Sequence, residues 1–196
     1  MIPIKVLVPS GVLGLGFDLE ALNNGVKNNP DIISIDGGST DSGPYSLGSG
    51  TSKYSRAAIK AEWKSLMIAR EKANVPLIIG SCGTCGTNGM VDWMENITIE
   101  LAGELNQNIK IAKLYCQQEK NFIKKKFQLS KIFPLNPAPM LNDHLIEEMT
   151  NIVALAGAEQ IQECINTGAE IILAGRTTDT AIISALPLMK GANPGS

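Results

Sequence analysis

The sequence predicts a three-layer α/β domain in which helices cover both faces of a mainly parallel sheet of about six strands. Three observations lead to this prediction. Short apolar runs of strand length alternate with longer segments of helical periodicity. Glycine-rich loops follow several of these runs, and 44% of the 196 residues are apolar, which is ample for one core. We therefore expect residues 1–196 to form a single Rossmann-like domain.

Six segments have the length and apolar content of buried strands. They are residues 4–8, 31–35, 75–79, 109–115, 151–155 and 170–173. The last two have short apolar cores. Because such runs alternate with helices in βαβ units, we expect the strands to run mainly parallel.

Apolar side chains at helical spacing lie between these strands. Three segments each place such residues on one helical face. The three sets are Ile59, Trp63, Leu66 and Met67; Met94, Ile97, Leu101 and Leu105; and Ala158, Ile161, Cys164 and Ile165. A less clear helical pattern of apolar residues follows the fourth predicted strand. Residues 132–139 contain three prolines in six positions, which predicts a connector or a lid.

Composition and charge exclude several classes of protein. The 17 basic and 19 acidic residues give a net charge of −2, which favours neither nucleic acid nor an anionic membrane surface. The first apolar stretch is too short for a signal peptide or a membrane span. The four cysteines are expected to be reduced, so we predict a cytoplasmic protein. For such a domain a homo-oligomer is the base-rate expectation.

The unusual residues lie in loops that directly follow predicted strands. Parallel strands all end at one edge of the sheet, where loops and helix N-termini offer free backbone N–H groups to a ligand. We call this the carboxyl edge. The loops are residues 10–16, 36–45, 80–89 and 175–179. The first has Gly-x-x-Gly-x-Gly spacing, the reverse of the dinucleotide fingerprint and weak evidence for NAD, so the sequence identifies no cofactor.

The loop after the second strand is the most informative. Gly37 and Gly38 allow a ligand to approach the backbone. Acceptors and hydroxyl donors surround them, namely Asp36, Ser39, Thr40 and Asp41. A tight turn capped by these side chains is the alternative explanation. The run of small residues then continues towards a helix start suited to an anion, through Gly48, Ser49 and Gly50.

The loop after the third strand contains a Cys-x-x-Cys motif, Cys82 and Cys85, before a predicted helix. A helix dipole at that position lowers the pKa of a thiol, which suits a nucleophile or a redox pair. Inert, partly buried cysteines are the alternative. Zinc would need two more ligands, and the chain offers no second closely spaced pair. We therefore expect no metal at these thiols.

Arg176 follows the last predicted strand and can clamp a carboxylate or phosphate with its guanidinium group. A salt bridge to Asp179 or Asp36 is the alternative. The carboxylates of this edge also suit magnesium, although their spacing does not require it. His144 lies at the predicted start of a helix in another segment, and we do not expect it to act as a base.

These loops resemble the acyclic terpene utilisation (AtuA-like) family. The resemblance rests on residues 36–45 (DGGSTDSGPY), 47–50 (LGSG), 80–86 (GSCGTCG) and 175–179 (GRTTD), and it extends over almost the whole chain. It implies a bacterial protein connected with the breakdown of acyclic terpenes, a pathway of acyl-CoA thioesters and carboxylated intermediates. Family members are longer, which implies that this chain corresponds to their N-terminal domain. The resemblance implies no known reaction.

Both lines of reasoning lead to one hypothesis, an enzyme domain that binds an anionic organic acid or acyl-CoA derivative at the carboxyl edge. The anion, or a developing oxyanion, would be held by backbone N–H groups near Gly37, Gly38, Gly83 and Thr84 and by Arg176. Asp36 or Asp41 would transfer protons, and Cys82, supported by Cys85, would be the nucleophile of a covalent acyl transfer. A non-catalytic ligand-binding or complex-forming subunit and a thiol redox domain are the alternatives.

Overall fold

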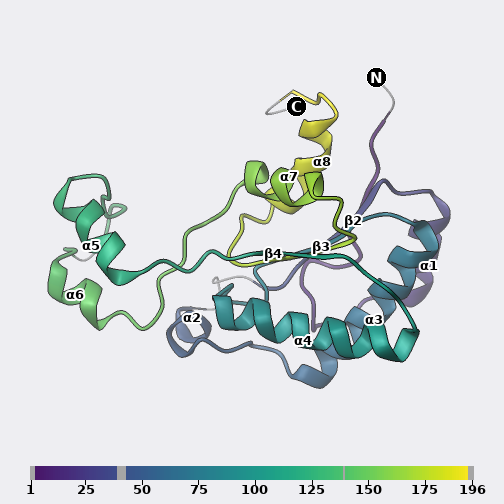
Figure 1. Ribbon diagram of the computed structural model, residues 1–196, viewed down its shortest axis with the longest axis horizontal. Coiled ribbons are helices and arrows are strands. Elements are labelled where there is room, and N and C mark those ends of the chain that lie inside the picture. The colour runs from purple at the N-terminus through teal and green to yellow at the C-terminus, as the bar shows by residue number, and fades with distance from the viewer. Residues whose placement is uncertain (1–2, 39–42, 139, 194–196) are drawn as a thin grey trace.

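The computed structural model describes residues 3–38, 43–138 and 140–193. Within them, five parallel strands form one sheet in the order β1-β2-β3-β5-β4, with helices on both faces, and the predicted fold class is confirmed (Figure 1). The strands are β1 (Val6–Leu7), β2 (Ile32–Asp36), β3 (Leu77–Gly80), β4 (Ile111–Leu114) and β5 (Ile171–Ala174). Each overlaps a predicted strand.

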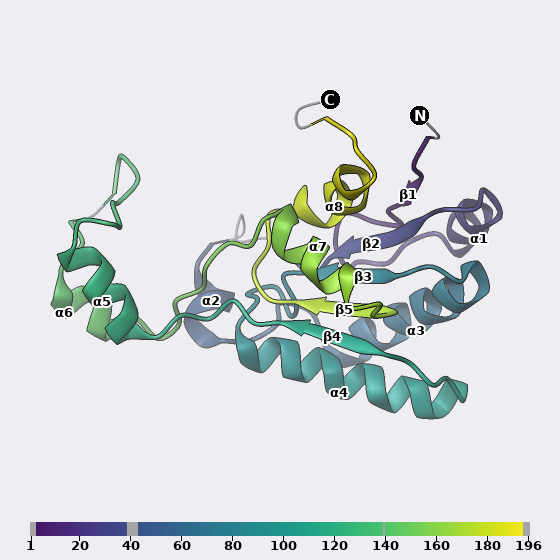
Figure 2. The same cartoon turned by 45° about the horizontal axis from the view of Figure 1, so that its top comes forward.

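Three helices cover one face of the sheet and two cover the other (Figure 2), counted over the described residues. The first face carries α1 (Leu19–Lys27), α3 (Arg56–Ala73) and α4 (Asn88–Leu105), and the second carries α7 (Ala158–Asn166) and α8 (Ala181–Met189). No helix in the described part of the chain is long and apolar enough to span a membrane.

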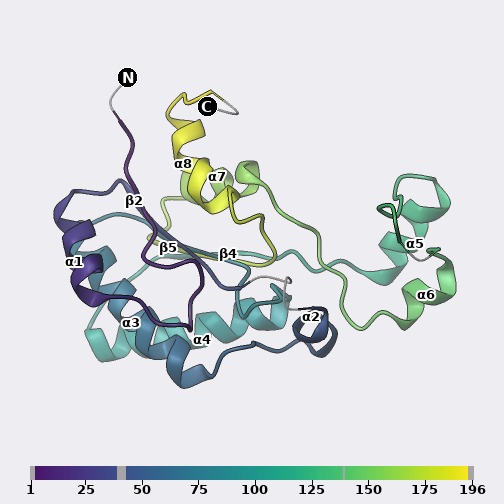
Figure 3. The same ribbon diagram turned by 180° about the vertical axis from the view of Figure 1, so that it is seen from behind.

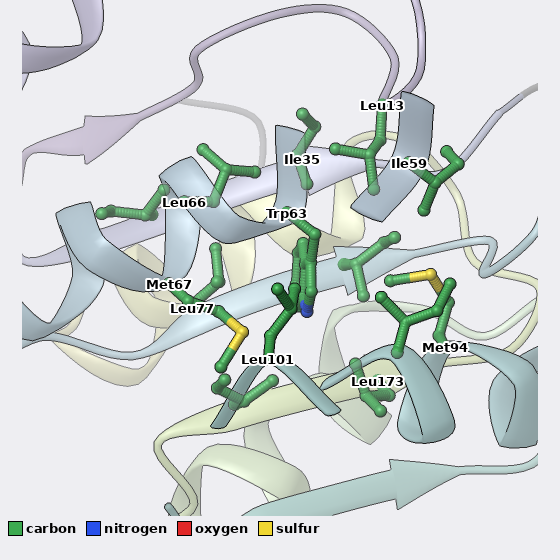
Figure 4. Packing of buried hydrophobic residues seen from close by; sticks show 14 of the residues in the cluster. Leu13, Ile35, Ile59, Trp63, Leu66, Met67, Leu77, Met94, Leu101 and Leu173 are labelled. Carbon is green, nitrogen blue, oxygen red and sulfur yellow. The ribbon is translucent and has the colours of Figure 1, made fainter. Parts of the chain in front are cut away.

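The larger hydrophobic core lies between the sheet and helices α3 and α4 (Figure 4). Trp63 lies at its centre, completely buried, and its indole Nε1 donates a hydrogen bond of 2.9 Å to Thr98 Oγ1. Burying a helix side chain of this size against the sheet stabilises a domain by roughly 3–5 kcal/mol, which is the usual loss when tryptophan is truncated to alanine. The second core, under α7 and α8, includes Ile78, Ile172 and Ile182.

Residues 151–155 are not a strand of the sheet, so the prediction of a sixth strand is wrong. This segment runs antiparallel to residues 116–118, with one isolated bridge between Gln117 and Val153. Two backbone hydrogen bonds of 2.8 Å hold the pair, from Gln118 N to Ile152 O and from Ala154 N to Cys116 O. The segment lies beyond the end of β4, and its residues are half-buried or exposed.

This antiparallel pair is the base of an arm, residues 117–156, that extends from the carboxyl edge away from the sheet (Figures 1 and 3). The arm carries α5 (Lys120–Gln128) and α6 (Asp143–Glu148). The described part of the proline-rich segment, residues 132–138, connects these two helices. It exposes 74% of Phe133 and 87% of Leu135. Of the two predictions for this segment, the connector is therefore confirmed and the lid is not.

Candidate functional site at the carboxyl edge

All four predicted loops are connected by hydrogen bonds at the carboxyl edge. From the first loop, Leu13 N donates to Asp36 O at 2.8 Å. Gly37 N donates to Gly80 O at 2.7 Å, and Thr84 N donates to Gly37 O at 3.1 Å. The side chain of Arg176, in the loop after β5, donates to Gly38 O and Thr84 O. It thereby joins this loop to the loops after β2 and β3. The parallel register explains this convergence, since Asp36 and Gly80 are paired at the ends of β2 and β3.

Asp36 is the last residue of β2, and its side chain lies at the centre of this edge. Only 8% of the residue is exposed, and its Oδ1 atom has no hydrogen-bond partner among the described residues. Burial, which disfavours the charged carboxylate, raises the pKa of Asp36 to about 7, and the nearby charge of Asp179 adds to the increase. The positive charge of Arg176 and the N–H groups of Gly38 and Gly37 oppose it. The carboxyl group therefore exchanges its proton near neutral pH.

Arg176 lies between the loops rather than on the surface. Its Nη1 donates to the carbonyl oxygen of Gly38 at 3.1 Å, to Ser81 Oγ at 3.2 Å and, more weakly, to the carbonyl oxygen of Thr84 at 3.4 Å. The other guanidinium nitrogens have no hydrogen-bond partner among the described residues, and the group forms no ion pair with the described carboxylates. One end of the guanidinium is thus fixed by the protein.

The glycines of this edge are required by contacts between loops. A Cβ atom on Gly37 would lie 2.5 Å from Ser81 O and 2.8 Å from Gly80 O. Gly38 has a φ of +133° and packs against Thr84. Because the N–H of Gly37 already donates to Gly80 O, it is not available to a ligand, and that part of the predicted anion site is corrected.

The loop of residues 10–16 binds a carboxylate from its own protein. Gly14 N donates to Glu62 Oε2 and Gly16 N to Glu62 Oε1, each at 2.7 Å. Tyr54 fills the space beside Gly14, whose φ is +109°. Backbone N–H groups of a glycine-rich loop are donors that could otherwise bind an anionic ligand. The glycine spacing therefore reflects an internal carboxylate from α3 that occupies the loop.

Cys82 and Cys85 are both completely buried, and their thiols are free. Burial raises the pKa of the Cys82 thiol well above its usual value, with smaller contributions from Cys116 and Asp36. Reactive cysteines are instead exposed and have lowered pKa values. This environment fits the alternative of inert core cysteines better than a nucleophile or a redox pair. Within the described residues, no three His, Cys, Asp or Glu side chains gather where a metal ion would fit.

The other predicted site residues occupy different surroundings. Ser39, Thr40 and Asp41 lie outside the described residues. Gly48 and Ser49 belong to α2 (Tyr45–Ser49), which ends at Gly50 with a φ of +68°. Asp179 is exposed, whereas Gly83 and Thr84 are buried, and Thr84 Oγ1 accepts a hydrogen bond of 3.2 Å from Lys53 N.

Helix α2 is attached to the base of the arm. Thr150 Oγ1 donates to Gly48 O at 2.7 Å, and Asn151 Nδ2 donates to Leu47 O at 2.8 Å. These contacts use carbonyl oxygens, so they position α2 without blocking backbone donors. A pocket of about 290 Å³ opens beside Thr150 at this base. Its other lining residues are Gln117, Gln118, Glu119, Lys120, Asn121, Glu147 and Ile152.

Two residues that the sequence reasoning did not assign to the site are central to it. Ser81 is completely buried, and its Oγ accepts hydrogen bonds from the Arg176 side chain and from Thr177 N. Thr177 is also completely buried, with no hydrogen-bond partner for Oγ1 among the described residues. Both stand next to predicted site residues, but only the hydrogen bonds between Ser81 Oγ and the backbone of Thr177 show that they lie side by side. His144 lies exposed on α6, with Nε2 3.4 Å from Glu148 Oε1.

Comparison with known proteins identifies a family. The model of the acyclic terpene utilisation family protein AtuA matches residues 45–190, a range that contains the loop after β3, the arm and Arg176. No curated protein and no solved structure matches the chain.

Proposed function

Because this chain belongs to the acyclic terpene utilisation (AtuA) family, we propose that its carboxyl edge binds an anionic organic acid or acyl-CoA derivative of that metabolism and that Asp36 transfers a proton there. The observation that carries the proposal is the buried Asp36 carboxyl group, whose pKa is raised to about 7 and whose Oδ1 lacks a partner in the described structure. Buried polar groups without a partner are rare and call for a functional explanation.

Proton transfer is the chemistry that this carboxyl group suits best. A general acid or base is most effective when its pKa lies close to the working pH, because both protonation states are then populated. An ordinary aspartate, with a pKa near 3.8, is a weak base at neutral pH. Burial at the end of β2 strengthens Asp36 as a base and allows it to return the proton as an acid.

Arg176 supplies the charge that an anionic ligand needs. Its Nη1 is fixed by Gly38 and Ser81, so the free side of the guanidinium group is oriented before a ligand arrives. A planar guanidinium binds a carboxylate through two parallel hydrogen bonds. The proposal thus combines a preoriented cation, after β5, with a proton-transfer group at the end of β2, two strands separated only by β3. A covalent route through Cys82 is not part of it, because that thiol is buried and protonated.

The test measures the binding of short carboxylates and acyl-CoA thioesters to the 196-residue chain by calorimetry and thermal shift. Arg176→Ala is expected to weaken carboxylate binding by about 10- to 100-fold, which is the effect of losing a charged hydrogen-bond pair. Asp36→Asn is expected to preserve binding and abolish turnover. Arg56→Ala and Asp143→Asn serve as matched controls, since both residues lie at exposed sites away from the edge. Equal affinity in Arg176→Ala and Arg56→Ala would refute the site.

A non-catalytic, complex-forming subunit is the second candidate. The arm favours it, because Phe133, Leu135 and Met140 expose 74%, 87% and 87% of their surface. Exposed apolar groups of this kind are typical of protein contacts. The Asp36→Asn variant distinguishes the two candidates. In a binding subunit the substitution changes only the affinity for the ligand, whereas in an enzyme it abolishes turnover while the protein still folds.

A further inference from the structure

Two buried oxygen atoms at the carboxyl edge lack hydrogen-bond partners in the described part of the chain, Asp36 Oδ1 and Thr177 Oγ1. Asp36 is 8% exposed and Thr177 is completely buried. The backbone of Thr177 is well satisfied, since its N–H donates to Ser81 Oγ at 3.4 Å and its carbonyl accepts from the same hydroxyl. The side-chain hydroxyl of Thr177 is therefore not needed to hold the loop.

The two oxygens lie on the same face of the sheet. Side chains alternate along β2, where Ile33 and Ile35 pack into the core under α3 and α4 while Ser34 reaches α8 through a 2.7 Å hydrogen bond to Ile182 O. Asp36 therefore points to the α8 face, like Ser34. Its register partner is Gly80. A Cβ atom on Gly80 would overlap Thr177 Oγ1 and approach Ile182, which places Thr177 over the neighbouring strand on that same face.

Because Gly80 has no side chain, Thr177 Oγ1 takes the position that a Cβ atom would occupy there. Asp36, the register partner of Gly80, stands beside it on β2. A hydroxyl group is the ligand group that complements this pair, because it donates one hydrogen bond and accepts another. Asp36 accepts from such a hydroxyl when ionised, and Thr177 donates to it. A methylene group at the same place would leave both protein oxygens unpaired.

We propose that this edge selects hydroxylated carboxylic acids, or their thioesters, and that the ligand's hydroxyl group binds between Asp36 and Thr177 while Arg176 binds its anionic group. The inference rests on the proposed function and makes it specific. Thr177 is then a specificity-determining residue, and Asp36 is placed to take the proton of the ligand's hydroxyl group. That transfer forms an O–H bond on the carboxylate, breaks the O–H bond of the ligand and needs no further reactant.

The test compares matched pairs of acids with and without a hydroxyl group on the 196-residue chain by calorimetry. Suitable pairs are 3-hydroxybutyrate with butyrate, lactate with propionate, and malate with succinate. We expect at least one hydroxylated acid to bind about tenfold or more tightly than its partner, because a site built for a hydroxyl discriminates strongly against its absence. The proton taken up or released on binding, measured in buffers of different ionisation enthalpy, reports on Asp36.

Thr177→Val removes the hydroxyl while preserving shape. It is expected to abolish the preference within each pair and to leave the affinity for the acid without the hydroxyl unchanged, whereas Thr177→Ser restores the preference. Because Oγ1 is unpaired, Thr177→Val is also expected to keep or raise the melting temperature of the free protein. Thr98→Val is the matched control. It removes another buried threonine hydroxyl, bonded to Met94 O and Trp63 Nε1, and should lower the melting temperature without affecting selectivity.

The possible outcomes separate the inference from the proposed function. Equal affinities within every pair, or a preference that survives Thr177→Val, would overturn the hydroxyl site and leave carboxylate binding intact. Absence of binding for every acid, at concentrations up to the millimolar range of weak ligands, would overturn both. A lower melting temperature in Thr177→Val with unchanged selectivity would show that the hydroxyl is structural, and would also overturn the inference.

Discussion

At the scale of single residues, Asp36 has the most unusual surroundings among the described side chains of the carboxyl edge. Its carboxyl group is buried at a strand end, close to Asp179 and without a partner for Oδ1 in the described structure. Burial of a charge without a pair costs free energy, so the folded protein prefers the protonated form. The folded state therefore holds this proton more tightly than the unfolded chain does.

The pH dependence of stability follows from this difference. Between pH 4 and 7 the folded state binds more protons at Asp36 than the unfolded state, so this group's contribution to stability is complete below the unfolded pKa of 3.8 and is lost as the pH rises through about 7. Asp36→Asn should remove that loss. At pH 8 its free energy of unfolding, measured by urea denaturation, should exceed that of the native protein by up to a few kcal/mol. Asp143→Asn, at an exposed site, should follow the native curve. A native-like pH profile in Asp36→Asn would contradict the raised pKa.

Glu62 shows how one side chain fixes a loop. Its two carboxylate oxygens accept hydrogen bonds from Gly14 N and Gly16 N, and Leu13 N in the same loop donates to Asp36 O at 2.8 Å. Glu62→Ala leaves two backbone donors without their acceptor. We expect a loss of about 1–3 kcal/mol in the free energy of unfolding. Glu71→Ala, on the exposed end of the same helix, should cost less than about 1 kcal/mol. Equal losses would argue against a special role for Glu62.

At the scale of elements, the carboxyl edge depends on close contact between loops. Gly86 has a φ of +66°, and a Cβ atom there would overlap the backbone nitrogen of Arg176. The loop after β3 therefore supports the loop after β5 directly. Parallel strands alone do not produce this contact, because it requires a glycine where the two backbones meet.

Gly86→Ala tests this packing. The substitution should lower the free energy of unfolding by more than about 1 kcal/mol, since both the left-handed backbone and the overlap with Arg176 oppose it. Carboxylate binding should weaken with it. Gly89→Ala is the matched control, because Gly89 lies in α4 with no atom within 4 Å of its Cβ position, and alanine there should stabilise the helix by about 0.5–1 kcal/mol. Indistinguishable unfolding curves for the two variants would exclude the proposed packing.

At the scale of the whole molecule, the layered domain and the arm differ in how they are stabilised. Leu173 on β5 is completely buried between sheet and helices, whereas Leu135 at the end of the arm is 87% exposed. Helix α5 has no buried residue among those described, and Ile146 is the one buried residue of α6. The arm therefore adds little to the core.

Leu173→Ala and Leu135→Ala should accordingly differ widely in their effect on the free energy of unfolding. The first should cost about 2–5 kcal/mol in chemical denaturation, which is the usual cost of a cavity in a well-packed core. The second should change stability by less than about 0.5 kcal/mol. A loss above 1 kcal/mol for Leu135→Ala, roughly the limit for a surface residue, would show that the arm's end is covered in solution.

The sequence by itself determined the layered fold and which loops meet at one edge. Apolar runs and helical spacing specify the parallel sheet, and strands that run parallel must end at the same edge. Residues 151–155 were predicted wrongly because a short apolar run does not reveal whether a neighbouring strand lies within reach. Asp36 and Arg176 were identified as candidates from their positions after strands.

Only the tertiary structure decided which side chains are accessible and which are paired. Cys82 has the local pattern of a reactive thiol, but it is completely buried in the core formed with α3 and α4. The glycine spacing near Gly14 resembles a ligand loop, but Glu62, 48 residues further along the chain, occupies it. Thr177 gave no sequence signal, because an unpaired buried oxygen is a property of its three-dimensional surroundings. Hydrogen bonding and desolvation depend on contacts between distant segments, which local sequence patterns do not encode.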